Sequence, residues 1–169
     1  MCANNLRQIG IAWYLYLDDN DETFPASVES HMFGGKAGQK WYRVETAETR
    51  ILNKYLDVFS EEDKNGLEVF HCPSDSKPTM RIGYTEFDYC GNSYQYNESL
   101  NSNKLSSIQV PLTRLWLADD YSFYHGNSID NTKKNVLFVD GHVKMYNYTD
   151  DYDIGNDDPS KEVYIRPSR

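Results

Sequence analysis

Residues 135–146 read Asn135-Val136-Leu137-Phe138-Val139-Asp140-Gly141-His142-Val143-Lys144-Met145-Tyr146, and this stretch decides the fold class. Runs rich in β-branched and aromatic residues flank the pair Asp140-Gly141. Gly accepts a positive φ and Asp tolerates one, so this pair is preferred in the type I′ turn that joins two antiparallel strands. The stretch therefore predicts a β-hairpin with a type I′ turn at Asp140 and Gly141.

Other strand candidates lie outside the hairpin. Residues 113–118 contain Leu115, Trp116 and Leu117 in succession, which is typical of a buried strand. Cys72-Pro73-Ser74-Asp75 predicts a turn. The weaker strand candidates are residues 67–70, 82–86, 93–96 and, at an edge, 162–165. We expect the sheet to lie within about residues 67–147.

The chain begins with a predicted amphipathic helix over about residues 3–17. Its inner face is formed by residues at i, i+3, i+7 and i+11, and Ile11 and Leu15 widen the apolar surface. The inner-face residues are Leu6, Ile9, Trp13 and Leu17. The polar run Asp18-Asp19-Asn20-Asp21-Glu22 ends the helix, and Phe24-Pro25 imposes an extended exit.

A second, shorter helix is predicted over residues 46–58, with Ile51, Leu52, Tyr55 and Leu56 on its apolar side. A helix followed by mostly antiparallel strands is typical of the α+β class. The sequence shows neither an internal repeat nor a linker. We therefore expect one domain over residues 1–169, an N-terminal amphipathic helix packed on an antiparallel sheet.

The composition narrows the classes of partner. The chain of 169 residues has a formal net charge of −9 and no basic stripe with interleaved aromatic residues. Binding to nucleic acid or to an anionic lipid surface requires clustered Lys and Arg, so we expect neither partner. No run of 18 apolar residues occurs, so the sequence predicts no transmembrane helix within it.

Three motifs carry a resemblance to a known family. They occur in the family's order and span residues 2 to 143. The first is Cys2-Ala3-Asn4-Asn5-Leu6-Arg7-Gln8-Ile9-Gly10, continued by residues 16–21 and Phe24-Pro25; the second is Phe70-His71-Cys72-Pro73-Ser74-Asp75; the third is residues 135–143. Together they resemble the type IV pilin-like, prepilin-type pseudopilins with a processing-associated H-X9-DG domain, similar to pseudopilin G of type II secretion.

The resemblance implies a pilin-like fold and a structural role rather than catalysis. It implies an apolar helix before Cys2 that anchors the precursor in the inner membrane, removal of a leader by a prepilin peptidase, and assembly into a filament. The implied location is the periplasm or the cell surface. The implied partners are other pseudopilin subunits and the secretion machinery. In the family nine residues separate the motif's His from Asp-Gly, whereas fourteen separate His125 from Asp140 here.

The resemblance also bears on the three cysteines. Cys2 and Cys72 both lie in family motifs, so a Cys2–Cys72 disulfide is the first expectation and Cys72–Cys90 is the second. Three reduced thiols remain an open alternative. A catalytic Cys72 beside His71 is not expected, because neighbouring residues on a strand point to opposite faces.

Two other functions compete with a filament subunit. The first is an exported surface or periplasmic glycan-binding module that uses Tyr-rich loops such as residues 121–124. The second is a hydrolase that uses His125 with Asp140. Against the hydrolase, Asp140 and His142 fall at a hairpin turn, where Asp is favoured for the backbone alone. We therefore expect no enzyme.

The acidic loop over residues 150–158 is a candidate calcium site. Asp151, Asp153, Asp157 and Asp158 place carboxylates around Gly155, and Ca²⁺ takes six to eight oxygen ligands. Pseudopilin G proteins, which the chain resembles, carry Ca²⁺ in their C-terminal region. The alternative is a solvated acidic loop. Asp18, Asp19 and Asp21 form a second acidic group, which we interpret as a helix-terminating loop.

Overall fold

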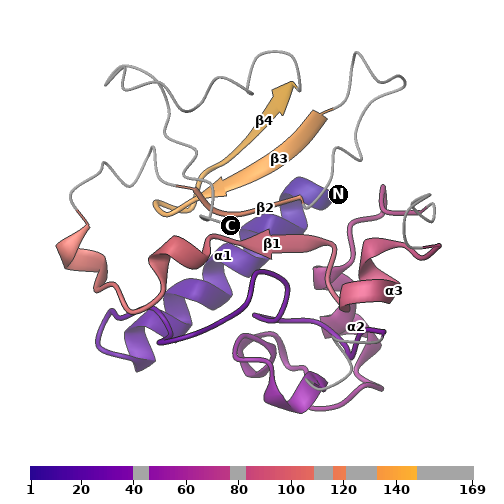
Figure 1. Ribbon diagram of the computed structural model, residues 1–169, viewed down its shortest axis with the longest axis horizontal. Helices are drawn as coiled ribbons and strands as arrows, with labels where there is room; N and C mark the ends of the chain where they lie inside the picture. Colours follow the sequence, from indigo (N-terminus) through magenta and orange to yellow (C-terminus); the bar gives the residue numbers. More distant parts are fainter. Residues whose placement is uncertain (40–45, 77–82, 109–115, 121–132, 148–169) are drawn as a thin grey trace.

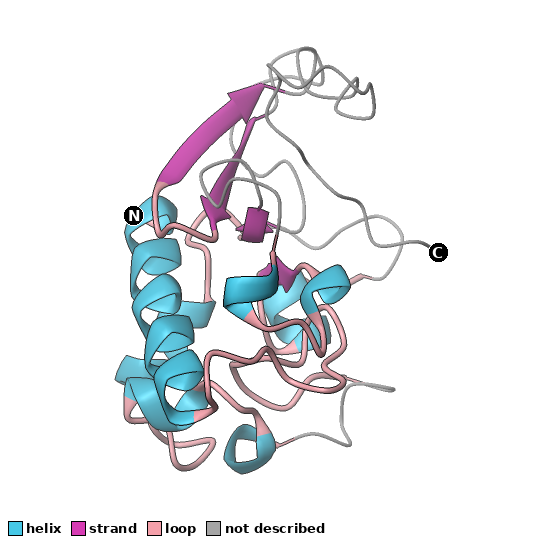
Figure 2. Ribbon diagram, turned by 90° about the vertical axis from the view of Figure 1, so that its left-hand side faces the viewer, coloured by secondary structure: helices cyan, strands magenta, loops and turns pink. Residues whose placement is uncertain are grey.

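The computed structural model describes residues 1–39, 46–76, 83–108, 116–120 and 133–147. The fold is α+β, with one long N-terminal helix, a four-stranded antiparallel sheet and several short helices (Figure 1). The helix α1 runs along one side of the molecule, and the short helices and loops lie beside it (Figure 2). Among the described residues no helix has both the length and the apolar character to cross a membrane.

The sheet has the strand order β1-β2-β3-β4, and every neighbouring pair is antiparallel. The strands are β1 (Tyr94–Tyr96), β2 (Trp116–Asp120), β3 (Lys133–Phe138) and β4 (Val143–Asn147). The expected strands at residues 93–96 and 113–118 are therefore confirmed within the described residues; residues 113–115 lie outside them. The outer edge of β1 is covered by a loop, since the Tyr96 amide donates to the Ser30 carbonyl at 2.7 Å.

The β3–β4 hairpin is confirmed, but the predicted turn type is wrong. Gly141 has φ +89°, whereas Asp140 is not among the residues with positive φ, as a type I′ turn would require. Instead, the Gly141 amide donates to the Phe138 carbonyl and the Phe138 amide to the His142 carbonyl, both at 2.9 Å. This is the three-residue loop in which Gly takes the left-handed position after a tight turn.

The N-terminal helix is also confirmed, as α1 (Cys2–Asp19). Its predicted inner face of Leu6, Ile9, Trp13 and Leu17 is buried against the sheet and the loops. The Trp13 ring stacks on Tyr96 of β1 with centroids 4.6 Å apart. The helix ends within the acidic run, as expected, and Asp21 and Glu22 then take left-handed conformations.

The predicted helix over residues 46–58 is wrong as a continuous element. Two short 3₁₀ helices, η2 (Ala47–Thr49) and η3 (Asn53–Leu56), replace it. Between them Arg50 has an extended backbone. Its buried guanidinium donates to the carbonyls of His31 (2.8 Å), Gly34 (2.7 Å) and Cys90 (2.8 Å). These carbonyls belong to other loops, and the break allows the guanidinium to reach them.

Two predicted strands are helical in the structure. Residues 67–70 belong to α2 (Lys64–Leu67) and η4 (Glu68–Phe70), and Leu67 and Phe70, three residues apart, are both buried. The described part of residues 82–86 leads into α3 (Glu86–Cys90), which starts at a Thr85 cap and ends at Gly91 with φ +80°. The remaining short helices are η5 (Glu98–Leu100) and η6 (Leu105–Ser107).

Candidate functional site: the outward face of the N-terminal helix

The outward face of α1 carries exposed apolar side chains. Ile11 is 61% exposed, Leu15 is 46% exposed and Tyr14 is 40% exposed. They lie at i, i+3 and i+4, so they form one continuous cluster, which we call the helix patch. Asn4, Arg7, Asp18 and Asp19 are the exposed polar residues on the same helix. The expectation that Ile11 and Leu15 widen the apolar surface holds, but they point away from the core.

The hairpin holds the helix patch in place from one side. The Tyr14 hydroxyl donates to the Val139 carbonyl, and Gly141 lies beside the Tyr14 ring. Burial, and secondarily the nearby Asp140 carboxylate, raise the pKa of Tyr14, so the hydroxyl keeps its proton. One turn before Tyr14 on the same side of the helix, a Cβ on Gly10 would lie 3.2 Å from a methyl of Leu137. Gly10 therefore allows α1 to approach β3 closely.

The start of α1 is attached to the Cys-Pro turn. Cys2 and Cys72 form a disulfide, with Cα atoms 5.0 Å apart, so the first expected pairing is confirmed and the Cys72–Cys90 pairing is wrong. The Asn5 side-chain amide donates to the carbonyls of Glu68 (3.1 Å) and His71 (2.9 Å). The predicted turn is also present, since the Asp75 amide donates to the Cys72 carbonyl at 2.8 Å.

Asp75, the last residue of this turn, and Glu86, the first residue of α3, form a buried acidic pair. The Asp75 carboxylate accepts from the amides of Glu86 (3.1 Å) and Phe87 (2.8 Å) and from the Ser93 hydroxyl (2.8 Å). Burial, and secondarily the Asp75 charge, raise the pKa of Glu86 to about 7. The buried Cys90 thiol lies 3.6 Å from the Glu86 carboxyl, to which it donates. Only the Asp at the end of Cys-Pro-Ser-Asp, a favoured residue at a turn, offered a signal in the sequence.

A second buried polar group surrounds His31. Its Nδ1 lies 3.2 Å from the Tyr94 carbonyl, and its own carbonyl accepts from Arg50. Desolvation by burial is the main cause that lowers the pKa of His31 to about 4, and the Arg50 charge acts in the same direction. A neutral His31 and the Arg50 guanidinium, which donates to three loop carbonyls, fasten the loops to one another, which is a structural role.

The structure places few of the predicted site residues together. Asp140 and His142 lie at the hairpin turn, where the Asp140 carboxylate accepts from the His142 amide and contacts its ring. The His142 ring stacks on Phe138, which supports the structural reading of this pair. His71 is not on a strand, and its ring stacks on Phe87 with centroids 4.4 Å apart.

Several predicted sites lie outside the described residues. These are His125, the Tyr-rich loop at residues 121–124, the edge strand at 162–165, and the calcium candidates Asp151, Asp153, Asp157 and Asp158. Within the described ranges, no three side chains of His, Cys, Asp or Glu gather in a way that would hold a metal ion.

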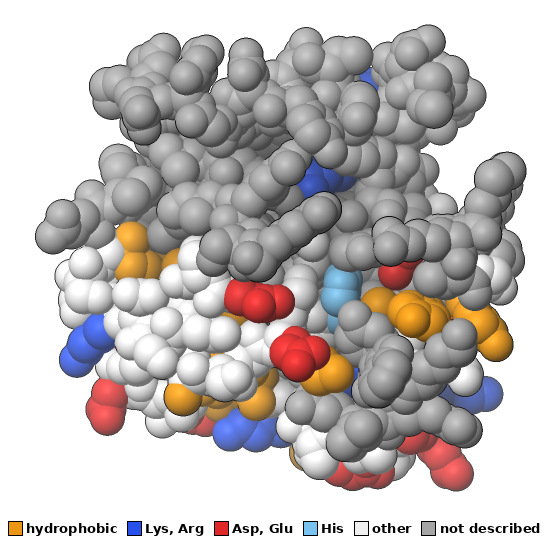
Figure 3. Space-filling model, in the orientation of Figure 1, with side chains coloured by type: hydrophobic (Ala, Val, Ile, Leu, Met, Phe, Trp, Pro, Cys, Tyr) orange, Lys and Arg blue, Asp and Glu red, His pale blue; other side chains and the backbone are white. Residues whose placement is uncertain are grey.

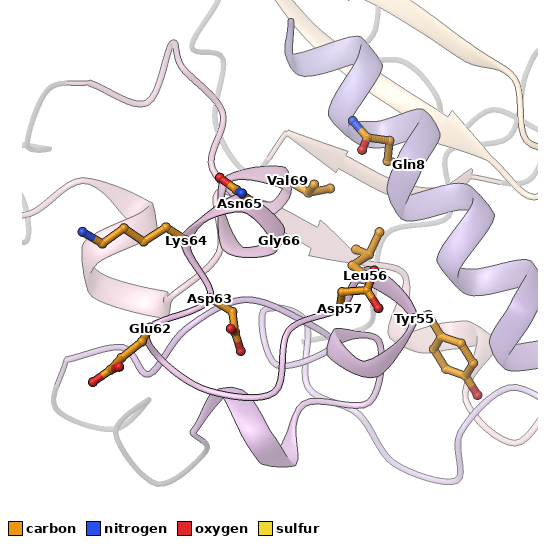
Figure 4. A pocket seen from close by; sticks show the side chains of 10 residues that line it. All are labelled: Gln8, Tyr55, Leu56, Asp57, Glu62, Asp63, Lys64, Asn65, Gly66 and Val69. Atoms are coloured by element: carbon orange, nitrogen blue, oxygen red, sulfur yellow. The ribbon is translucent and has the colours of Figure 1, made fainter.

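A groove with a volume of about 710 Å³ lies between α1, η3 and α2. Figure 4 shows its polar side chains pointing in different directions, and Glu62 and Lys64 point away from Gln8. The Asp63 carboxylate is already used, since it accepts from the amides of Phe59 and Ser60 at 2.7 Å. The groove therefore lacks convergent groups for a ligand.

Charge on the surface is mixed. On the face shown in Figure 3, acidic and basic side chains lie interspersed among the coloured residues, without a continuous basic patch. Among the described residues, we therefore take the helix patch, with its neighbouring exposed apolar side chains, as the candidate site. Comparisons with family models, with curated proteins and with solved structures found no match.

Proposed function

We propose that this protein is a structural subunit of a type IV pilin-like filament, the role that its three sequence motifs imply. The observation that supports it most is the helix patch of Ile11, Tyr14 and Leu15, three exposed apolar side chains on a helix whose other face is fully packed. In such a subunit the N-terminal helix connects the globular domain to an apolar anchor upstream. Neighbouring copies would cover the outward face of α1 in the assembled filament.

The position of α1 suits this role. The helix lies at one side of the molecule, and its outer side faces away from the rest of the described chain (Figure 2). The side chains of Ile11 and Leu15 contribute little to the fold, because they are about half exposed. An exposed apolar cluster is costly in a protein that stays monomeric, so we infer that association buries it.

Filament assembly tests the proposal. The chain is expressed with an apolar helical segment of about 20 residues fused before Cys2, together with a prepilin peptidase. We expect filaments in electron micrographs from the wild type and none from Ile11→Ser with Leu15→Ser. Asn4→Asp, an exposed change about two turns before the patch on the same helix, should assemble like the wild type.

The fold of each variant is measured separately. The purified domain with Ile11→Ser and Leu15→Ser should melt within a few degrees of the wild type, because changes at exposed sites alter stability by only about 0.5 kcal/mol. Unimpaired assembly of this double variant would contradict a role for the patch. A monomeric wild type with saturable, Tyr124-dependent glycan binding would instead support the glycan-binding alternative.

A further inference from the structure

The first turn of α1 and the segment at residues 68–75, which begins with η4, are joined on one side of the helix. Cys2 is bonded to Cys72, and Asn5 donates to two carbonyls of the same segment. Cys2 and Asn5 are three residues apart, so they face the same direction. Cys2, Asn5 and Cys72 are all buried, so this junction is shielded from solvent.

The same segment is joined at its far end to α3 and to the residues before β1. The turn that starts at Cys72 brings the Asp75 amide onto the Cys72 carbonyl. The Asp75 carboxylate then accepts the first amides of α3 and the Ser93 hydroxyl. The Ser93 amide in turn donates to the Phe70 carbonyl at 2.9 Å. The turn from Cys72 to Asp75 thus links the disulfide to the carboxylate that holds the start of α3.

We propose that the Cys2–Cys72 disulfide and the Asp75 carboxylate form a redox-dependent clamp that fastens α3 and the start of β1 to the first turn of α1. The bond holds the turn, the turn directs the carboxylate, and the carboxylate holds α3. Oxidation of the Cys2 and Cys72 thiols therefore fastens α3 and the start of β1 to the first turn of α1. The clamp does not depend on the filament role.

The clamp closes by thiol–disulfide exchange with an external disulfide, either of a protein or of a small molecule. The Cys2 and Cys72 thiols lose two protons and two electrons, one S–S bond forms between them, and the external disulfide is released as two thiols. Cys90 stays outside this exchange, because Cys2 and Cys72 are bonded to each other and the Cys90 thiol instead donates to Glu86.

The β3–β4 hairpin provides an internal reference. Its backbone hydrogen bonds, such as that from Phe138 to His142, involve none of the residues of the clamp. A clamp that acts locally changes the opening of the Asp75 turn and of α3 while it leaves the hairpin almost unchanged.

Amide hydrogen exchange of the oxidised and the reduced wild type tests the clamp. We expect reduction to speed exchange at the amides of Asp75, Glu86 and Phe87 by about tenfold or more relative to the Phe138 amide, each tenfold being about 1.4 kcal/mol of opening free energy. Cys90→Ala should show the same redox difference. Cys2→Ala with Cys72→Ala should resemble the reduced wild type and should not respond to reductant.

Asp75→Asn separates the carboxylate from the disulfide. This variant should keep the Cys2–Cys72 bond by mass spectrometry, yet exchange quickly at Glu86 and Phe87 in both redox states. Because Asp75→Asn keeps both cysteines, it still tests the clamp if the double cysteine variant does not fold. Three outcomes would each overturn the clamp. Reduction could speed exchange at the hairpin as much as at the clamp, or it could leave exchange at Glu86 and Phe87 unchanged. The third outcome is the recovery of three thiols after oxidative refolding.

Discussion

Trp13 contacts aromatic rings of the core that come from several parts of the chain. It is fully buried, it stacks on Tyr96, and its ring lies within 6.0 Å of the rings of Phe24 and Phe33. Trp13→Ala would remove a large ring that connects α1, β1 and the loops. We expect it to lower the free energy of unfolding by about 3–5 kcal/mol. Denaturant unfolding measures the loss, with Leu15→Ala as the exposed control; a loss below about 1 kcal/mol would disprove the central role of Trp13.

Glu86 should make stability depend on pH. Its pKa is raised from 4.5 to about 7 in the folded state, so between these values the folded protein holds a proton that the unfolded chain releases. The free energy of unfolding therefore falls as the pH rises from about 4.5 to about 7. Allowing for solvent screening, we expect the free energy of unfolding of Glu86→Gln, taken relative to that of the wild type, to increase by about 2 kcal/mol as the pH rises over this range.

Urea unfolding of both proteins at pH 5 and pH 8 measures this gain. His31 acts in the opposite direction, because its pKa is lowered to about 4 and the unfolded chain takes up its proton first as the pH falls. It is present in both proteins, so its contribution cancels in the difference. A difference that stays constant with pH would show that Glu86 is ionised in the folded protein throughout.

At the scale of the element, the β3–β4 hairpin depends on Gly141. Its φ of +89° is unfavourable for residues with a Cβ, whereas the space around it is ordinary, since an added Cβ would lie 3.4 Å from the Tyr14 ring. Gly141→Ala should therefore cost about 1–2 kcal/mol through the backbone alone. Gly141→Asn should cost less, because Asn tolerates this region. Thermal melting compares the two, and equal losses would point to crowding at Tyr14 instead.

The short elements show where local patterns are insufficient. Residues 67–70 form a short apolar run, which fits a buried strand and a helical turn equally well. Residues 46–58 have helical periodicity, yet Arg50 interrupts it to donate to carbonyls from distant loops. In both cases the long-range contacts outweigh the local preference, because propensities differ by only about 1 kcal/mol per residue.

At the scale of the whole molecule, the acidic C-terminal loop is the remaining expected site. Five carboxylates lie between Asp150 and Asp158 with no Lys or Arg among them, so a bound cation would relieve their mutual repulsion. We expect Ca²⁺ at 100 times its dissociation constant to add about 2.7 kcal/mol of stability. Melting with Ca²⁺ and with chelator measures this. Asp153→Ala with Asp157→Ala should abolish the effect, and identical melting of the wild type in both conditions would leave a solvated loop.

The sequence by itself determined the elements that local chemistry specifies. These are α1, from its 3.6-residue apolar period, the turn at Cys72-Pro73-Ser74-Asp75, and the hairpin at Asp140-Gly141. Only the tertiary structure decided the buried polar contacts around Arg50, Asp75 and Glu86, because their partners are far apart in the chain. The cysteine pairing shows the same division. Family motifs suggested Cys2 and Cys72, but only packing α1 against the segment at residues 68–75 brings their Cα atoms within 5.0 Å across 70 positions of sequence.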